Sequence, residues 1–212
     1  MLFRSLSFPR IQGADIAGYI VAVGSLVSED RIGERVMVDF SLYNTETDSM
    51  AFIDYIGHGR NGGYADYCSV PAENAHAVGT ELTDPELATF CCAYVTAEHM
   101  LDRARVGEGE TVLVTGASGG VGSGLIQLCR ARGAVPVAVS SEGYEAALKE
   151  IGAEAVSLRG GKSLAMQLGA EVPGRPVDVV ADLVGGKLFN ELINLLKPEG
   201  RYISAGAIAG AV

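Results

Sequence analysis

The sequence predicts an α/β protein in which a doubly wound parallel sheet follows a smaller, β-rich part. Two observations support this fold class. After Glu110, short apolar runs alternate with helical patterns, as expected of strands that are covered on both faces and joined by helices. Before residue 85, short apolar runs are separated by Gly, Pro and Asp, which is typical of strands joined by turns. The predicted domains are therefore residues 1–84 and 85–212.

The first part is expected to contain short strands and to end where a helix begins. The expected strands cover residues 18–23, 35–40 and 63–70. Thr83 or Asp84 can cap the following helix, and Pro85 suits its first turn. Glu86 adds an acidic residue to that turn, and residues 88–101 continue as a largely apolar helix.

The second part alternates strands with helices. Strands are expected over residues 111–116, 135–140, 154–158, 177–184 and 201–206. Helical stripes are formed by Val121, Leu125, Leu128 and Cys129, by residues 144–151, and by Leu188, Leu192, Leu195 and Leu196. Right-handed crossovers between such strands give a doubly wound sheet. The last helix and strand of the usual six-stranded sheet are not found, so we expect the chain to be a fragment that is a poor enzyme on its own, even if it binds cofactor.

Composition excludes several classes of protein. The chain carries 26 acidic and 16 basic residues and no basic run, so it should repel nucleic acid. No apolar run approaches the ~20 residues that span a membrane, and the N-terminus does not resemble a signal peptide. The cysteines are Cys68, Cys91, Cys92 and Cys129, without a CxxC pair. We therefore expect a cytoplasmic protein without a disulfide framework.

The most informative segment is VLVTGASGGVGSG at residues 112–124. Ala117, Gly119 and Gly122 match the GxGxxG pattern, with alanine in the first place. Such a loop ends a strand tightly, lets the backbone approach a pyrophosphate and packs the next helix on the sheet. Amides at that helix N-terminus then face the phosphates. The alternative is a Gly-rich turn with no ligand. The predicted cofactor-binding residues here are Gly116, Ala117, Ser118, Gly119, Gly120, Val121 and Gly122.

The end of the second strand of the sheet indicates which dinucleotide is preferred. An Asp or Glu there would accept from the ribose 2′-OH of NAD and repel a 2′-phosphate. The sequence has Ser140 and Ser141 instead, which favours NADP. Glu142 follows them, and no Lys or Arg is adjacent, so NAD stays possible.

The chain resembles the medium-chain dehydrogenase/reductase superfamily, particularly its zinc-independent quinone oxidoreductase-like branch. The similar segments are FPRIQGADIAGYIVAVG (8–24), RIGERVMV (31–38), GGYADYCSVPAENA (62–75), ATFCCAYVTAEHML (88–101), VLVTGASGGVG (112–122) and LLKPEGRYISAGAIAG (195–210). The resemblance implies part of a GroES-like catalytic domain in residues 1–84. It implies a Rossmann dinucleotide-binding domain, lacking its last strand, in residues 85–212.

The resemblance also bears on metal and nicotinamide binding. Zinc-dependent relatives have His-Glu where this chain has Ala14-Asp15, and Cys92 lies where they keep another ligand. An open catalytic zinc site needs three protein ligands, so we expect no zinc. His58, His76 and His99 are too dispersed to replace the missing ligand. The positions that match nicotinamide contacts in the family are Thr96, Leu183, Val184, Gly206 and Ala207. The alternative for Thr96 is a hydrogen bond from its hydroxyl group to the backbone of its own helix, and the alternative for Leu183 and Val184 is packing in the hydrophobic core.

These observations favour a reductase that passes hydride from NADPH to a small electrophilic acceptor, a quinone or an α,β-unsaturated carbonyl. Its proton donor is not identified, because Tyr43, Tyr55 and Tyr64 are equally suited to packing. The alternatives are a zinc-type alcohol dehydrogenase, an enoyl reductase module of a larger synthase, and a non-catalytic NADP-binding redox sensor. For the full-length protein, a homodimer is an open option.

Overall fold

The computed structural model describes residues 8–43 and 52–210, which form two compact units, Met1–Cys92 and Ala93–Val212. The division between the units falls within α2 (Phe90–Arg103). The domain boundary expected from composition, after residue 84, falls at the start of the preceding helix and eight residues before this division. No helix in the described ranges is long and apolar enough to cross a membrane.

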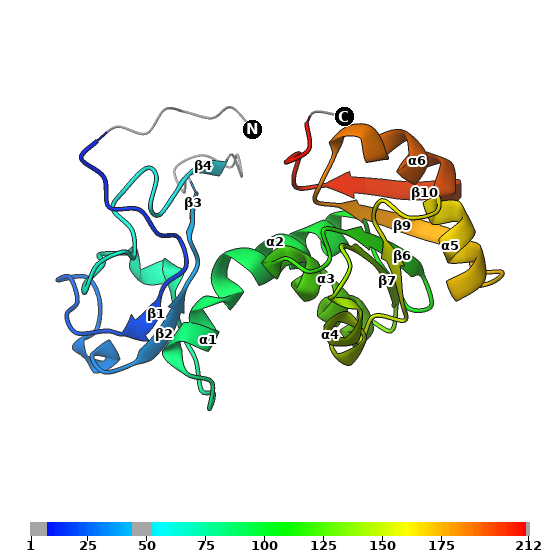
Figure 1. Cartoon of the computed structure of the whole chain (residues 1–212). Helices are drawn as coiled ribbons and strands as arrows, with labels where there is room; N and C mark the ends of the chain where they lie inside the picture. The colour runs from blue at the N-terminus through cyan, green and yellow to red at the C-terminus, as the bar shows by residue number, and fades with distance from the viewer. Residues whose placement is uncertain (1–7, 44–51, 211–212) are drawn as a thin grey trace. The chain divides into compact units, whose positions relative to one another are not determined.

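The first unit is built from short antiparallel strands (Figure 1). One sheet has the order β1 (Ala17–Tyr19), β2 (Arg35–Val38) and β5 (Ala75–Ala77), and β3 (Ser41–Tyr43) pairs with β4 (Phe52–Tyr55). Two 3₁₀ turns, Glu29–Arg31 and Ala72–Asn74, join these elements. The strands expected over 18–23 and 35–40 are thus present in shorter form.

The strand expected over residues 63–70 is wrong, because the structure has bends there. The amide groups of Gly62 and Gly63 donate to the carbonyls of Ile11 and Gly13, at 2.8 and 2.9 Å. A Cβ at Gly62 would lie 2.1 Å from the Gly13 carbonyl oxygen. The two glycines therefore let this segment turn closely around residues 11–13, and the apolar residues after them do not join a sheet.

The helical segment begins as the sequence predicts. Thr83 caps α1 (Asp84–Ala88), and the Oε2 atom of Glu86 accepts from the Thr83 amide at 2.8 Å, which completes a capping box. Asp84 instead binds the Arg35 guanidinium at 2.7 Å. The segment divides at Thr89 into α1 and α2, where one continuous helix was expected.

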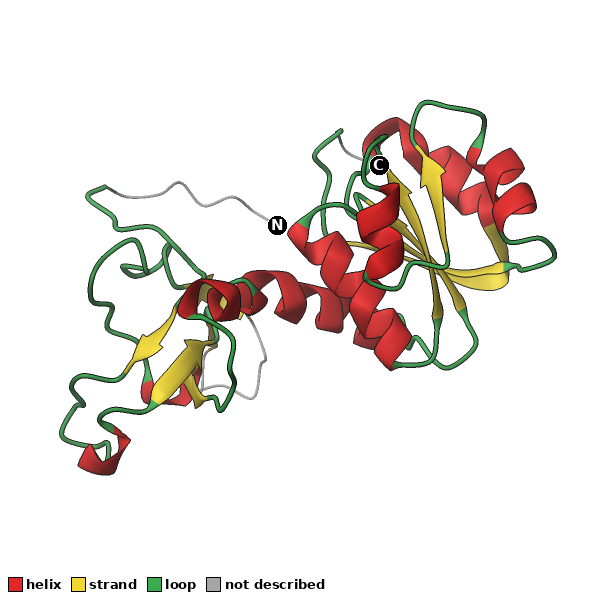
Figure 2. Ribbon diagram, turned by 60° about the horizontal axis from the view of Figure 1, so that its bottom comes forward, coloured by secondary structure: helices red, strands yellow, loops and turns green. Residues whose placement is uncertain are grey.

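The second unit is a five-stranded parallel sheet with helices on both faces (Figure 2). Its strand order is β10 (Leu196–Ser204), β9 (Val177–Asp182), β6 (Thr111–Thr115), β7 (Val135–Ser140) and β8 (Ala155–Leu158). The helices are α3 (Gly120–Ala131), α4 (Glu145–Glu150), α5 (Leu164–Glu171) and α6 (Phe189–Leu195), the last preceded by a 3₁₀ turn, Gly186–Leu188. The predicted doubly wound parallel sheet is confirmed.

Two details of this unit differ from the sequence prediction. Helix α5 was not expected, because the segment is short and follows two glycines; Ser163 caps it, and Leu164 and Leu168 are its buried contacts. Leu196 was assigned to a helical stripe, but it begins β10 beside Val177.

The buried side chains of the sheet divide between its two faces. On one face Val112 and Val114 pack with residues of α2, α3 and α4. On the other face Leu113 packs with residues of α5 and α6. All of β6 is buried, so the central strand is fixed on both sides and its C-terminal end holds the following loop in place.

Candidate active site

The loop after β6 makes its tight turn at Gly116. This residue has φ +60°, which favours glycine, and its carbonyl accepts from the Gly119 amide at 3.1 Å. Ala117 is fully buried, and its amide donates to the Val139 carbonyl at 3.3 Å. Because Gly116 carries the left-handed conformation, alanine is accommodated in the first place of the motif.

The remaining two glycines of the motif differ in what surrounds them. A Cβ at Gly122 would lie 2.4 Å from the Gly116 carbonyl oxygen, so this glycine permits close packing of α3 on the loop. A Cβ at Gly119 would meet only that same oxygen, at 3.4 Å. Gly119 is exposed at the N-cap of α3, where no side chain accepts from the helix amides. These amides are arranged to receive an external anion such as a pyrophosphate.

The neighbouring residues of the loop are placed around this helix start. Ser118 and Gly120 are exposed, and Val121 is half-buried. Thr96 is half-buried on α2, three residues after Ala93. A Cβ added at Gly120 would lie 3.4 Å from the Cβ of Ala93. Thr96 thus lies on the helix that packs against the loop, and its contact with a nicotinamide stays a prediction.

The loops after β9 and β10 lie against the glycine loop. A Cβ at Gly116 would be 3.4 Å from side-chain atoms of both Leu183 and Val184. A Cβ at Gly206 would be 2.4 Å from the Leu183 carbonyl oxygen, and one at Gly185 would be 3.1 Å from the Cα atom of Ala207. The structure therefore brings these predicted residues together at the carboxyl ends of three adjacent parallel strands, where open α/β sheets bind ligands.

A buried carboxylate that the sequence analysis missed holds the loop after β9. Asp182 is fully buried and accepts from the hydroxyl groups of Thr115 and Tyr202. It also accepts from the amides of Val184 at 2.9 Å and Gly185 at 3.1 Å. Burial raises the pKa of this carboxyl group, but the hydrogen bonds outweigh burial and hold the pKa below its usual value.

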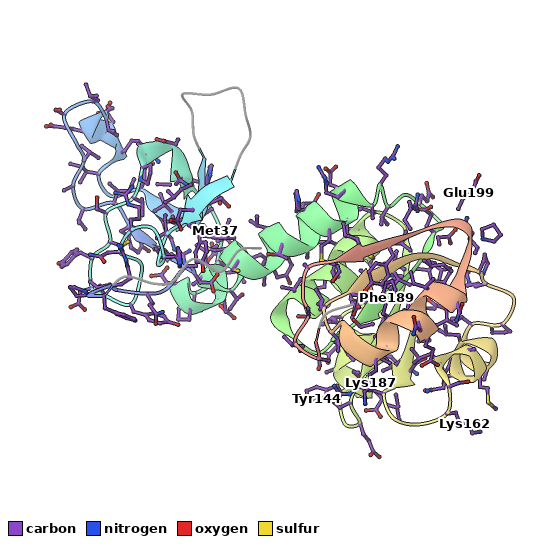
Figure 3. The ribbon with its side chains drawn as sticks, turned by 90° about the horizontal axis from the view of Figure 1, so that it is seen from above. Met37, Tyr144, Lys162, Lys187, Phe189 and Glu199 are labelled. Carbon is purple, nitrogen blue, oxygen red and sulfur yellow. The ribbon has the colours of Figure 1, made fainter. Side chains whose placement is uncertain are left out.

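Tyr202 connects this carboxylate to helix α6. Its ring meets that of Phe189 edge to face, with centroids 5.2 Å apart, and Figure 3 shows where Phe189 lies in the second unit. Burial and the Asp182 carboxylate both raise the pKa of the Tyr202 phenol, so its hydroxyl group stays a donor. A single Asp at a strand end gave no distinctive signal in the sequence.

The end of β7 contains the residues predicted to select the dinucleotide. Ser140 is buried, and its hydroxyl donates to the Ser141 carbonyl at 2.9 Å, whereas Ser141 is exposed. The amide of Arg159 donates to the Ser140 carbonyl at 2.8 Å, which brings an exposed arginine residue beside this strand end. The sequence analysis missed Arg159, although it directly follows β8, the parallel neighbour of β7.

A separate pocket of about 250 Å³ in the first unit contains the position where zinc-dependent relatives keep a ligand. Ala14 lines it together with Tyr55 and Tyr64, two of the three tyrosines considered as proton donors. The side chain of Tyr43 lies outside the described part of the structure. The pocket is completed by Gln12, Gly13, Ile56 and Gly57.

The groups next to Ala14 make local hydrogen bonds. The Asp15 carboxylate accepts from the Cys92 amide at 2.7 Å. Burial raises the pKa of the neighbouring Cys91 thiol, which bonds to the Ile16 carbonyl. His58 bonds to Asp54 at 2.7 Å. In the described ranges, no group of three His, Cys, Asp or Glu residues could hold a metal ion, and zinc independence stays a prediction.

The fold and the glycine loop define a dinucleotide-binding α/β protein, and comparisons identify its family. Residues 2–80 match the alcohol dehydrogenase GroES-like domain, and residues 120–212 match the zinc-binding dehydrogenase domain. The chain belongs to the medium-chain dehydrogenase/reductase superfamily.

Three similar proteins illustrate the range of this superfamily. A solved structure from Sinorhizobium meliloti, provisionally assigned as an alcohol dehydrogenase, is 68% identical with a TM-score of 0.93, over 98% of this chain and 57% of its own. A mycocerosic acid synthase-like polyketide synthase of Mycobacterium tuberculosis is 32% identical over 92% of this chain and 8% of its own length. Acryloyl-coenzyme A reductase of Metallosphaera sedula is 28% identical over 97% of this chain and 63% of its own length. The chain spans less than two thirds of each relative.

Proposed function

We propose that the protein is an NADPH-dependent reductase that passes hydride to a C=C bond conjugated to a carbonyl group, as in an enone or a quinone. The observation that carries the proposal is the pocket around Ala14. Tyr55 and Tyr64 line it beside Ala14, which stands where zinc-dependent relatives have a metal ligand. A hydroxyl donor can polarise a carbonyl without a metal.

The comparisons support an oxidoreductase and leave its acceptor open. Acryloyl-coenzyme A reductase, by its name, reduces a conjugated C=C bond, and it is similar to nearly the whole of this chain. The similarity to a polyketide synthase supports a second candidate, an enoyl reductase part of a larger synthase, which would use the same chemistry on a carrier-bound chain.

Each part of the chain has a role in this proposal. NADPH supplies the hydride. The amides at the start of α3 bind its pyrophosphate, and Gly119 leaves room for it. Leu183, Val184, Gly206 and Ala207 form the wall against which the nicotinamide ring is oriented. Tyr55 or Tyr64 donates a hydrogen bond to the acceptor carbonyl and supplies the proton.

The proposal predicts NADPH oxidation by the full-length protein with an enone or a quinone as acceptor. Tyr55→Phe or Tyr64→Phe should lower kcat on the order of a hundredfold, the lower end of typical general acid contributions. The matched control is Tyr19→Phe, because Tyr19 is an exposed residue of β1 and does not line the pocket. If neither pocket variant changes kcat, the tyrosine mechanism is wrong. Binding of NADPH by the full-length protein without any turnover would favour the redox sensor.

Cofactor preference provides a second prediction. Ser141→Asp should shift the preference from NADPH towards NADH by about tenfold or more, because one repulsive charge contact costs on the order of 1–2 kcal/mol. Ser141→Ala is the matched uncharged control, and Arg159→Gln should weaken NADPH more than NADH. Fluorescence titration with both dinucleotides measures these shifts. A wild-type chain that already prefers NADH would contradict the serine argument.

Metal content is the third prediction. Purified protein should contain far less than one zinc ion per chain, since Ala14 offers no ligand atom and an open zinc site needs three. Treatment with a chelator should leave turnover unchanged. Elemental analysis that finds one tightly bound zinc, with turnover lost on its removal, would instead establish the alcohol dehydrogenase alternative.

A further inference from the structure

The first unit contains a second pocket, larger than the one around Ala14. Its volume is about 440 Å³, and its polar lining consists of Arg10, Arg60, Asn61, Tyr67, Cys68 and Ser69. None of these residues has a role in the chemistry proposed above. The lining contains two guanidinium groups and no carboxylate.

Hydrogen bonds fix the walls of this pocket. The Gly62 amide donates to the Ile11 carbonyl at 2.8 Å, and the Ile11 amide donates to the Oδ1 atom of Asn61 at 3.2 Å. The segments that carry Arg10 and Arg60 are thereby joined. Because Asn61 accepts through Oδ1, its NH₂ group is left to act as a donor.

The charges of Arg10 and Arg60 are not balanced within the described ranges. Among the other arginines of the described ranges, Arg31, Arg35, Arg130, Arg132 and Arg201 pair with carboxylates, whereas Arg103, Arg105, Arg159 and Arg175 do not. Neither Arg10 nor Arg60 has such a partner there, although the whole chain has a net charge of −10. The buried Nε atom of Arg10 also lacks a hydrogen-bond partner. A buried donor without an acceptor is costly, which is why such groups are rare unless a ligand completes them.

The electrostatic environment of the neighbouring side chains is consistent with a positively charged pocket. Burial raises the pKa of the Cys68 thiol, while the positive charge of Arg60 opposes this rise. Arg60 therefore acts electrostatically on a group that lines the same pocket. The Asp54 carboxylate lies against Gly59, but it is bonded to His58 and to the Tyr55 amide.

We propose that this pocket binds an oxyanion, a carboxylate or a phosphate group, through Arg10 and Arg60. Guanidinium groups match both anions in bidentate geometry. The Asn61 amide and the Ser69 hydroxyl supply further donors. We further infer that this anionic group is part of the acceptor, which rests on the proposed function. The enzyme should then prefer acceptors that carry an acidic group.

Direct binding tests the pocket without any turnover. Inorganic phosphate and succinate are titrated separately into the full chain and followed by calorimetry and by NMR shifts of residues 59–69. Arg10→Gln and Arg60→Gln should each weaken binding of the preferred anion at least tenfold, and Arg60→Lys should weaken it less. Arg175→Gln, an exposed arginine of the second unit, should have no effect. Tighter binding of phosphate or of succinate identifies which group the acceptor carries.

Turnover then tests whether the anion belongs to the acceptor. For an enone with a carboxylate or phosphate group, Arg60→Gln should raise KM about tenfold or more and leave kcat unchanged. For the methyl ester or the neutral analogue, KM should not change. Equal anion affinities in the wild type and both glutamine variants, with circular dichroism showing intact folds, would overturn the assignment of this pocket as an anion-binding site. Anion binding without any reductase activity would instead overturn the proposed function and retain the pocket.

Discussion

Gly119→Val is expected to lower the affinity for NADPH on the order of a hundredfold, about 2.7 kcal/mol, while the protein stays folded. A Cβ at this position meets only the Gly116 carbonyl oxygen, at 3.4 Å, so the protein itself can accommodate a side chain. The two methyl groups would occupy the space in front of the α3 amides, where the pyrophosphate must approach. Calorimetric titration with NADPH, alongside thermal unfolding, measures both quantities.

Gly122→Ala is the matched control from the same loop. Its Cβ would lie 2.4 Å from the Gly116 carbonyl oxygen and 2.6 Å from the Cα atom of Ala117. Such overpacking should cost about 1–3 kcal/mol of unfolding free energy even without cofactor. The two glycines thus separate a binding defect from a packing defect. Unchanged NADPH affinity in a folded Gly119→Val variant would contradict the assignment of the phosphate loop.

Asp182→Ala is expected to lower the free energy of unfolding by about 3–5 kcal/mol. The substitution leaves buried donors without an acceptor, among them the hydroxyl groups of Thr115 and Tyr202 and the Gly185 amide. Each buried donor that loses its partner costs about 1–3 kcal/mol, and part of this cost is recovered by relaxation. Urea unfolding of the wild type and the variant measures the loss. A decrease below about 1 kcal/mol would show that the network adds little to stability.

The same carboxylate should make stability depend on pH. Because the folded-state pKa of Asp182 is lowered, its charged form stabilises the protein above the unfolded-state pKa near 4. This contribution is lost as the pH falls through the folded-state pKa. The stability difference between the wild type and Asp182→Asn should therefore shrink as the pH falls below about 4. A difference that stays constant down to acid unfolding would contradict the lowered pKa.

The sequence predicted the parallel sheet well because its signal is local and strong. β6 is largely apolar, β9 is apolar apart from Asp178 and Asp182, and both are buried along their whole length, which is typical of the central strands of a parallel sheet. The segment 63–70 resembles a strand equally well, but its conformation is determined by contacts with residues 11–13, some fifty positions away. Helix α5 was missed because two leucines provide most of its burial.

In the candidate site, too, local sequence signals were predicted and contacts between distant residues were missed. The glycine loop was predicted because its spacing is fixed by the cofactor and by helix packing. Asp182 and Arg159 could not be identified in this way, since each acquires its role from a partner on another strand. Thr115 and Asp182 are 67 positions apart in the sequence, and their side chains meet because β6 and β9 are adjacent.

The wall proposed for the nicotinamide is shaped largely by main-chain atoms. Gly185 has φ +67°, and Gly206 leaves no room for a Cβ beside the Leu183 carbonyl. The Ala209 amide adds a bond to the Val184 carbonyl at 2.9 Å. Side chains that project from this wall, such as the exposed Ile208, are therefore free to vary over evolution while the shape of the wall persists. A lineage could in this way acquire new acceptors by surface substitutions and keep its dinucleotide throughout.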